Sequence, residues 1–535
     1  MAELHRRRFD SSELGDPTSL KRISRRAVLG GVAVGVGGVA ASTSGVAHGT
    51  ADVSSLANAR DFGVVGDGEA NDTAALQSWL THIVSNHRRG WLPNGTYKIT
   101  DTLIAPPGYG WSIIGESQDS TILKQFSDNI PILQLGTAEN SSHSYSLDSI
   151  NFSYAAKQTA SHVNANAIDF RNPINGTGST YYCSFKRLQF YNGHYALKYP
   201  VNAYGPWGCS WDELYMSDMS GGLLDCTGAL SSAANNTWGR ATMNCSGAVG
   251  PIFKNWTCYN TTVGVLEFIN ADRGPQLIAT GNAFSADIGA IKLEIGQYTG
   301  AGFGLINFSG DYYVRVGNLQ IGPGNFAPSS GILSAVNAGG GATSDNSFLE
   351  INTVVLASSA GEGYEKGYGG LSGPVVAFTG GGPPNRRISV NTVQLSGGWT
   401  LQSSQSSPTG NYLTVRSWVN GALSQDIGDS DYKVTVGSPN VVTFNSPFTA
   451  PRTITLPAAD GNDLCAGLYY EFVFDGSING GNIAVIKHGE EVLGVQKVDG
   501  KKINYMWRRG ANGGEWILTG TVDVGRSELS AGKSG

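Results

Sequence analysis

The stretch Cys183-Ser184-Phe185-Lys186-Arg187-Leu188-Gln189-Phe190 occurs twice more, in altered form, further along the chain. The second copy is Cys209-Ser210-Trp211-Asp212-Glu213-Leu214-Tyr215-Met216, and a fainter third copy is Thr237-Trp238-Gly239-Arg240-Ala241-Thr242-Met243. The copies are offset by 26 and 27 residues, and such a period is typical of a solenoid. In a solenoid the strands of successive coils stack in parallel, about 4.8 Å apart. The repeat predicts that Phe185 and Trp211 point inward.

The composition agrees with a coil of strands and turns. The 535 residues include 74 glycines, and only 15% of the residues are charged, whereas 40% are hydrophobic and 10% aromatic. This apolar content excludes a disordered chain, and the glycine content disfavours a helical bundle because glycine is a poor helix former. We therefore predict an all-β fold, a right-handed parallel β-helix (solenoid), in which glycine and asparagine form the corners between strands.

The N-terminus has the pattern of an export signal. Ser24-Arg25-Arg26-Ala27-Val28-Leu29 precedes an apolar run from Gly30 to Ala41. A basic region followed by a short apolar core indicates a signal peptide, here of the twin-arginine type. Residues 1–51 are thus predicted to direct the protein to the periplasm or the extracellular medium. The apolar run is too short to span a bilayer, so no membrane association is expected.

Charge and cysteine content narrow the partners further. Residues 1–50 carry a formal charge of +3, which leaves −9 on the remainder. An acidic body of this kind predicts no nucleic-acid partner. Five of the six cysteines lie between Cys183 and Cys258. They could form disulfides in an exported protein, but we favour small buried thiols, and their spacings fit no metal pattern.

Two structural regions are expected after the signal. Residues 52–430 carry the repeats and are predicted to form the coil. From Asp431 onward short segments alternate in β fashion, for example Arg452-Thr453-Ile454-Thr455-Leu456. Residues 431–535 are therefore predicted to form a small C-terminal β-sandwich-like domain built of hairpins. This segment weakly resembles modules at the ends of phage tail-fibre-like proteins.

Three blocks near the start of the coil carry a family resemblance. They are Asp61 to Gln77, in which a glycine-rich turn opens into a short helix capped at Asp72 or Thr73, then Gly90 to Ile99, and Trp111 to Glu116. In this order the blocks resemble the N-terminal signature of the pectate-lyase-like right-handed β-helix superfamily. That superfamily includes polygalacturonase- and rhamnogalacturonase-type enzymes and phage tailspike depolymerases.

The resemblance implies a function on polysaccharides. We expect a glycoside hydrolase that cleaves an extracellular polysaccharide in a lateral groove of the coil, without a cofactor. The alternatives are a lyase that β-eliminates at uronic acids, with Ca²⁺ as a possible cofactor and His194 as a possible base, and a non-catalytic glycan-binding protein. The likeness to tailspikes suggests a homotrimer.

One predicted outward column of side chains supplies the catalytic candidates. An apolar pair followed by a variable residue recurs in the second strand of the repeats, and the variable residues are Lys198, Asp225, Lys254, Glu267, Glu294 and Asn307. Glu267 and Glu294 break the alternation of charges. Two carboxyl groups one strand apart raise one pKa, and a spacing of about 4.8 Å is close to the ~5–5.5 Å of retaining glycosidases. Glu267 and Glu294 are the predicted pair, unless both are solvated surface residues.

A second column aligns Arg187, Glu213 and Arg240, which indicates structural ion pairing of Glu213. Asp212, with a single cationic neighbour at Lys186, is the further catalytic candidate.

The remaining candidates are substrate-binding side chains. Asp272 and Arg273, on a turn after Glu267, could hold sugar hydroxyls or a carboxylate, although such a pair often only stabilises a turn. Aromatic faces stack on sugars, and the aromatic candidates are Tyr191, Tyr204, Trp207 and Tyr215.

Overall fold

The computed structural model describes most of the chain between residues 56 and 523. The described segments are 56–140, 142–172, 180–229, 233–271, 276–294, 304–322, 334–339, 347–356, 373–379, 387–395, 399–402, 412–420, 424–434, 441–457, 469–475, 477–478, 482–497, 501–510 and 513–523. The predicted signal, residues 1–51, lies outside them. In these segments no helix combines the length and the apolar character needed to cross a bilayer.

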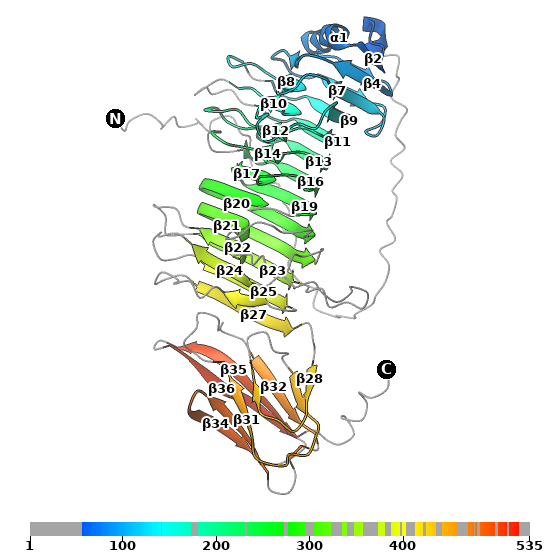
Figure 1. Ribbon diagram of the computed structural model, residues 1–535. Helices are drawn as coiled ribbons and strands as arrows, with labels where there is room; N and C mark the ends of the chain where they lie inside the picture. Colours follow the sequence, from blue (N-terminus) through cyan, green and yellow to red (C-terminus); the bar gives the residue numbers. More distant parts are fainter. Residues whose placement is uncertain are drawn as a thin grey trace, which may run out of the picture. The chain divides into compact units, whose positions relative to one another are not determined.

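Strands between residues 57 and 420 pair in parallel throughout and form a right-handed parallel β-helix (Figure 1). The predicted fold class is thereby confirmed. Two ladders of strands run along the coil. The first ladder consists of β1 (Ala57–Asn58), β3 (Arg89–Leu92), β6 (Ser112–Gly115), β9 (Ser146–Tyr154), β11 (Ser184–Tyr191), β13 (Ser210–Ser217), β16 (Thr237–Asn244), β19 (Thr261–Ile269), β20 (Leu277–Glu294), β21 (Gly304–Gly322), β23 (Phe348–Leu356), β25 (Arg387–Leu395) and β27 (Tyr412–Asn420).

The second ladder holds the shorter strands. It consists of β5 (Leu103–Ala105), β8 (Leu133–Leu135), β10 (Ile168–Phe170), β12 (Tyr195–Lys198), β14 (Gly222–Asp225), β17 (Phe253–Trp256), the first parts of β20 and β21, β22 (Ser334–Gly339), β24 (Gly373–Thr379) and β26 (Trp399–Gln402). A third set joins the first ladder at β9 and consists of β2 (Asp67–Asn71), β4 (Gly95–Ile99) and β7 (Thr121–Gln125).

One short helix packs on the first coils. α1 (Thr73–Ser85) follows the 3₁₀ turn Ala59–Phe62 and buries Leu76, Trp79 and Leu80 against the interior. Asp72 is the N-cap residue, as predicted, but its side chain does not cap the helix. Its carboxylate accepts hydrogen bonds from the amides of Val65 (2.6 Å) and Gly66 (2.9 Å) instead. It therefore fixes the preceding glycine-rich turn.

The three repeat copies stack in register, as their spacing predicts. Phe185 pairs with Trp211, which pairs with Trp238. All three side chains are buried, and their rings stack with centroids 4.1 and 5.1 Å apart. The five described cysteines are all buried, which confirms the preferred interpretation of them as small buried residues.

A corner separates each second-ladder strand from the first-ladder strand that follows it. Six corner residues have φ between 50° and 67°, namely Gly110, Ser144, Tyr182, Gly208, Asn235 and Asn260. This left-handed conformation favours glycine and asparagine. In the next coil β20 runs unbroken through both ladders, without a separate corner residue.

The first-ladder strands also bend in the middle. Ser149, Arg187 and Glu213 have positive φ at the bend. In later coils four glycines occupy the neighbouring column, namely Gly239, Gly264, Gly289 and Gly317.

Two smaller sheets follow β27. One consists of β28 (Ser424–Ile427), β30 (Val441–Phe444), β32 (Tyr469–Phe474), β35 (Lys501–Gly510) and β36 (Gly513–Asp523). The other consists of β29 (Tyr432–Lys433), β31 (Arg452–Leu456), β33 (Ala484–His488) and β34 (Glu491–Gln496).

The hairpins predicted for this region are wrong for its first six strands. Successive strands alternate between the two sheets, so that β28, β30 and β32 pair in parallel. Antiparallel pairs appear only with β34, β35 and β36. The proposed boundary at residue 430 remains a prediction.

Candidate functional site

The first half of the predicted outward column is correct. Lys198, Asp225 and Lys254 oppose one another on β12, β14 and β17. The Asp225 carboxylate lies 2.7 Å from the Lys198 ammonium and 3.7 Å from that of Lys254. The Asp225 side chain is buried, so these contacts make a structural charge ladder.

The second half of the column is wrong. β19 belongs to the first ladder, where Glu267 pairs with Lys292, while Glu294 pairs with Gly322. The two glutamates are therefore not stacked as a carboxyl pair. The apolar pair followed by a variable residue occurs in both ladders, and the sequence gives no sign of which ladder a copy belongs to.

The surroundings of Glu267 also differ from those of a proton donor. Its carboxylate lies 2.5 Å from the Arg240 guanidinium and accepts a hydrogen bond from the Thr242 hydroxyl (3.3 Å). The hydrogen bond from Arg240 lowers the pKa of Glu267 below its ordinary value. The like-charge argument predicted a raised pKa, so the physical basis for Glu267 as general acid is lost.

The Arg187–Glu213–Arg240 alignment exists, but its charges pair elsewhere. Arg187 contacts Asp148 (2.5 Å), and Arg240 contacts Glu267. Asp212 is exposed and opposes Lys186, as predicted. Its carboxylate lies against Gly239, where a Cβ atom would come within 1.9 Å of its oxygen.

The predicted substrate-binding residues do not form one cluster. Tyr191 and Tyr215 are neighbours with ring centroids 5.8 Å apart, and burial raises the pKa of Tyr191. Trp207 lies at the corner column, next to Tyr181, and Tyr204 is exposed on a loop. Asp272 and Arg273 lie outside the described residues.

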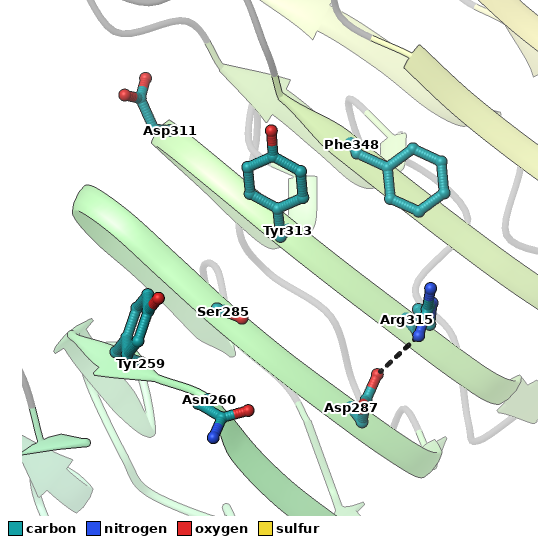
Figure 2. Close-up of a pocket in the computed structure, with 8 residues that line it drawn as sticks. All are labelled: Tyr259, Asn260, Ser285, Asp287, Asp311, Tyr313, Arg315 and Phe348. Atoms are coloured by element: carbon teal, nitrogen blue, oxygen red, sulfur yellow. Dashed lines mark ion pairs between the residues drawn. The ribbon is translucent and has the colours of Figure 1, made fainter. Parts of the chain in front are cut away.

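An open groove lies further along the coil, where the corner has ended (Figure 2). Its volume is about 470 Å³. Eight side chains line it, namely Tyr259, Asn260, Ser285, Asp287, Asp311, Tyr313, Arg315 and Phe348. Tyr259 comes from β18 (Cys258–Tyr259), Asn260 lies between β18 and β19, and the others come from β20, β21 and β23.

Strand alternation brings these side chains to one face. Ser285, Tyr313 and Phe348 oppose one another on adjacent strands, and two residues further on Asp287, Arg315 and Glu350 do the same. The guanidinium of Arg315 lies 4.0 Å from Asp287 and 3.6 Å from Glu350. Arg315 is thus a cation between two carboxylates, beside a row that contains two aromatic rings.

Sequence reasoning missed this groove. A signal was present, because Ser285-Ala286-Asp287 and Asp311-Tyr312-Tyr313-Val314-Arg315 alternate polar with apolar residues as half-buried strands do. The 26- to 27-residue repeat covers earlier coils and does not extend to these strands. In the described part of the chain, no group of three or more His, Cys, Asp or Glu side chains is arranged to hold a metal ion.

Known proteins resemble parts of this chain. Residues 56–169 match the family described as rhamnogalacturonase A/epimerase, pectate lyase-like. A glucan 1,3-beta-glucosidase of Cochliobolus carbonum is 35% identical over 89 residues, which make up 16% of this chain and 11% of that protein. The chain thus covers only a small part of that relative's length.

Solved structures with similar folds have low identity. The catalytic unit of a GH87 alpha-1,3-glucanase from Streptomyces thermodiastaticus is 12% identical, with a TM-score of 0.35 over 81% of this chain and 68% of that one. A tailspike protein of E. coli bacteriophage HK620 is 10% identical, with a TM-score of 0.44 over 88% and 91%.

The matched segment contains the three blocks Asp61 to Gln77, Gly90 to Ile99 and Trp111 to Glu116, and it forms the first coils of the parallel stack. Residues 56–169 thus resemble the rhamnogalacturonase A/epimerase, pectate lyase-like family by sequence, and the described chain has a parallel β-helix fold.

Proposed function

We propose that the protein is a glycoside hydrolase that binds an extracellular polysaccharide along the groove of β18 to β23. The observation that carries the proposal is the lining itself: three aromatic side chains, Tyr259, Tyr313 and Phe348, share one open groove with Asp287, Asp311 and Arg315. Aromatic faces stack on sugar rings, and charged side chains hydrogen-bond to sugar hydroxyls. The match to a glucan 1,3-beta-glucosidase supports this class of substrate.

The two carboxylates that line the groove, Asp287 and Asp311, and Glu350 beside it differ in their suitability for hydrolysis. Asp287 and Glu350 lie two strands apart in one column, about 9.6 Å between backbones, which is close to the ~6.5–9.5 Å carboxyl separation of inverting enzymes. Asp311 lies four residues from Arg315 on β21, about 13 Å along the strand. We therefore assign the acid and base to Asp287 and Glu350, and substrate binding to Asp311.

Arg315 has to exchange partners in this proposal. Its side chain is 68% exposed and touches both carboxylates only at 3.6–4.0 Å. A bound sugar hydroxyl can take one of these contacts. The carboxyl group thereby released is then free to carry the proton that the leaving oxygen needs.

The test is incubation of the purified protein with a panel of polysaccharides, starting with β-1,3-glucan. New reducing ends without ultraviolet-absorbing termini support hydrolysis, and absorbing termini would show a lyase. Binding without shortening of the chains would show a non-catalytic glycan-binding protein. Asp287→Asn and Glu350→Gln should each lower turnover at least 100-fold, whereas Glu267→Gln and Glu294→Gln should retain it. The reverse result would assign catalysis to Glu267 and Glu294 instead.

Three further properties belong to the proposal. Export through residues 1–51 predicts a mature N-terminus near residue 48 or 52, which mass spectrometry of the secreted protein checks.

Hydrolysis without a cofactor predicts full activity in EDTA, whereas a lyase that uses Ca²⁺ would lose activity. A homotrimer predicts three times the chain mass in light scattering.

A further inference from the structure

A row of aromatic rings lies along the corner of the coil; from Tyr109 onward each ring is in the position just before a corner residue. His87, Tyr109, His143, Tyr181 and Trp207 stack in this order, with centroid distances of 4.3, 5.3, 4.4 and 5.2 Å. From Tyr109 onward the backbones are linked by parallel bridges. Each coil thus adds one ring to the row.

The row is interrupted at one coil. The amide after Tyr181 (Tyr182) bonds to the Trp207 carbonyl, the amide after Trp207 (Gly208) to the Ala234 carbonyl, and the amide after Ala234 (Asn235) to the Tyr259 carbonyl. Ala234, on β15 (Ala233–Ala234), also pairs directly with Tyr259. Ala234 therefore occupies the ring position of its coil but carries only a methyl group.

Among the described residues of the row, only the methyl group of Ala234 lies between Trp207 and Tyr259. These residues lie two strand spacings apart, about 9.6 Å, so a ring placed midway lies about 4.8 Å from each. Carbon contacts are optimal at about 3.5–4.0 Å. This spacing matches the 4.3–5.3 Å between ring centroids in the row, and it also suits a puckered sugar ring, whose axial hydrogens project from its mean plane.

The residues around Ala234 also suit a sugar ring. Tyr259 is 53% exposed, and among the described residues its ring makes no contact with another aromatic ring. It also lines the groove of Figure 2. Next to Tyr259, the side-chain amide of Asn260 donates a hydrogen bond to the side-chain oxygen of Asn235 (2.8 Å). These two exposed side chains supply polar atoms for sugar hydroxyls.

We propose that the space over Ala234 is a sugar subsite, in which one pyranose ring of the bound polysaccharide stacks between Trp207 and Tyr259. This inference rests on the proposed glycan-binding function, and it adds one subsite to the binding site in the groove. The subsite lies three strand spacings from Tyr313, about 14 Å, so only a longer chain occupies both places. Trp207 acts here in substrate binding and specificity for chain length.

The experiment uses two opposite changes in the full chain. Trp207→Ala removes one wall, and Ala234→Trp fills the space with the missing ring. Binding of a β-1,3-glucan disaccharide and octasaccharide is measured by calorimetry in the Asp287→Asn background, which prevents cleavage. Both changes should weaken octasaccharide binding about tenfold and leave disaccharide binding unchanged. Tyr109→Ala, which removes a ring elsewhere in the row, is the matched control and should change neither.

The thermal midpoint adds a second measurement. Ala234→Trp completes the row and should raise the midpoint of the folded protein, whereas Trp207→Ala should lower it. Unchanged octasaccharide binding in both variants overturns the subsite. If Ala234→Trp does not fold, Trp207→Ala decides alone.

Tyr313→Ala separates the two proposals, because it weakens binding whenever the groove binds glycan. If neither oligosaccharide binds the parent protein, the proposed groove function and the proposed subsite are both wrong.

Discussion

At the scale of single residues, the glycines of the bend carry a packing requirement. A Cβ atom on Gly264 would lie 2.4 Å from the carbonyl oxygen of Gly239, and one on Gly289 would lie 2.6 Å from that of Gly264. These neighbours are backbone atoms held by the parallel ladder, so they cannot rotate away. Close approach of successive strands, rather than a positive φ, selects glycine here.

Gly264→Ala should therefore destabilise the protein by about 2 kcal/mol, the cost of an overpacked interior position. Gly250→Ala is the control, because its Cβ would meet only the Tyr195 hydroxyl at 3.6 Å, and it should stay within about 0.5 kcal/mol. Urea denaturation measures both. Equal stabilities of the two variants would contradict the packing argument.

His194 makes stability depend on pH. Burial, with a smaller contribution from Lys254, lowers the pKa of His194 to about 4 from its ordinary value of 6.5. Its Nδ1 lies 2.9 Å from the Ser220 hydroxyl. Between pH 6.5 and 4 the unfolded chain therefore binds one more proton than the folded protein does. As the pH falls through that window, His194 lowers the free energy of unfolding.

We expect His194→Gln to reduce the loss of stability between pH 7 and pH 4.5 by about 1–2 kcal/mol. Urea denaturation at several pH values measures the slope. His87→Gln, at an exposed histidine, should leave the slope as it is in the parent. An unchanged slope in His194→Gln would show that other groups cause the dependence. Because His194 is buried and its lowered pKa makes it a weak proton acceptor, it is also poorly suited to serve as the base of a lyase.

At the scale of elements, the corners repeat a backbone shape rather than a residue type. Glycine, serine, tyrosine and asparagine all occur in the corner column, although only glycine adopts a positive φ without cost. This mixture explains why the sequence shows the period of the coil more clearly than its corners. The same mixture hides the row of rings, whose members look unrelated in the sequence.

Ser144 offers a direct test of the corner. Its φ is 52°, and it is exposed. Ser144→Val should destabilise the protein by about 1–2 kcal/mol, because a β-branched residue is strained in the left-handed region. Ser144→Gly should be at least as stable as the parent. Thermal unfolding compares the three proteins; equal midpoints for valine and glycine would show that the corner is not strained.

At the scale of the whole molecule, α1 protects the interior of the first coils. Trp79 is 2% exposed and its indole donates to the carbonyl of Ala57 (2.8 Å), which ties the helix to the first strand. Trp79→Ala should cost about 3–5 kcal/mol and expose strand edges that favour association. Light scattering during thermal unfolding would show earlier aggregation. A monodisperse variant with the parent's midpoint would contradict a protective role.

The coil was predictable from the sequence because its evidence is local and repeated. Phe185, Trp211 and Trp238 recur at nearly constant spacing, and the structure stacks them as expected. The candidate site was not predictable in the same way. Whether Glu267 faces Glu294 or Lys292 depends on which ladder β19 joins, and that is decided by strand pairing across 25 residues. The parallel pairing of β28, β30 and β32 was missed for the same reason.

The unbroken course of β20 has one more consequence. Up to Asn260, a left-handed residue lies between each second-ladder strand and the first-ladder strand after it, and all but one of these coils from Tyr109 onward carry a ring beside it; β20 then runs unbroken through both ladders, and its side chains line the groove. The location of the groove is thus set by the coil in which the continuous strand β20 replaces the left-handed corner residue. Its chemistry is set by the side chains that line it. Because different residues determine the two, substitutions at Tyr313, Arg315 or Phe348 can change what is bound without moving the place where it binds.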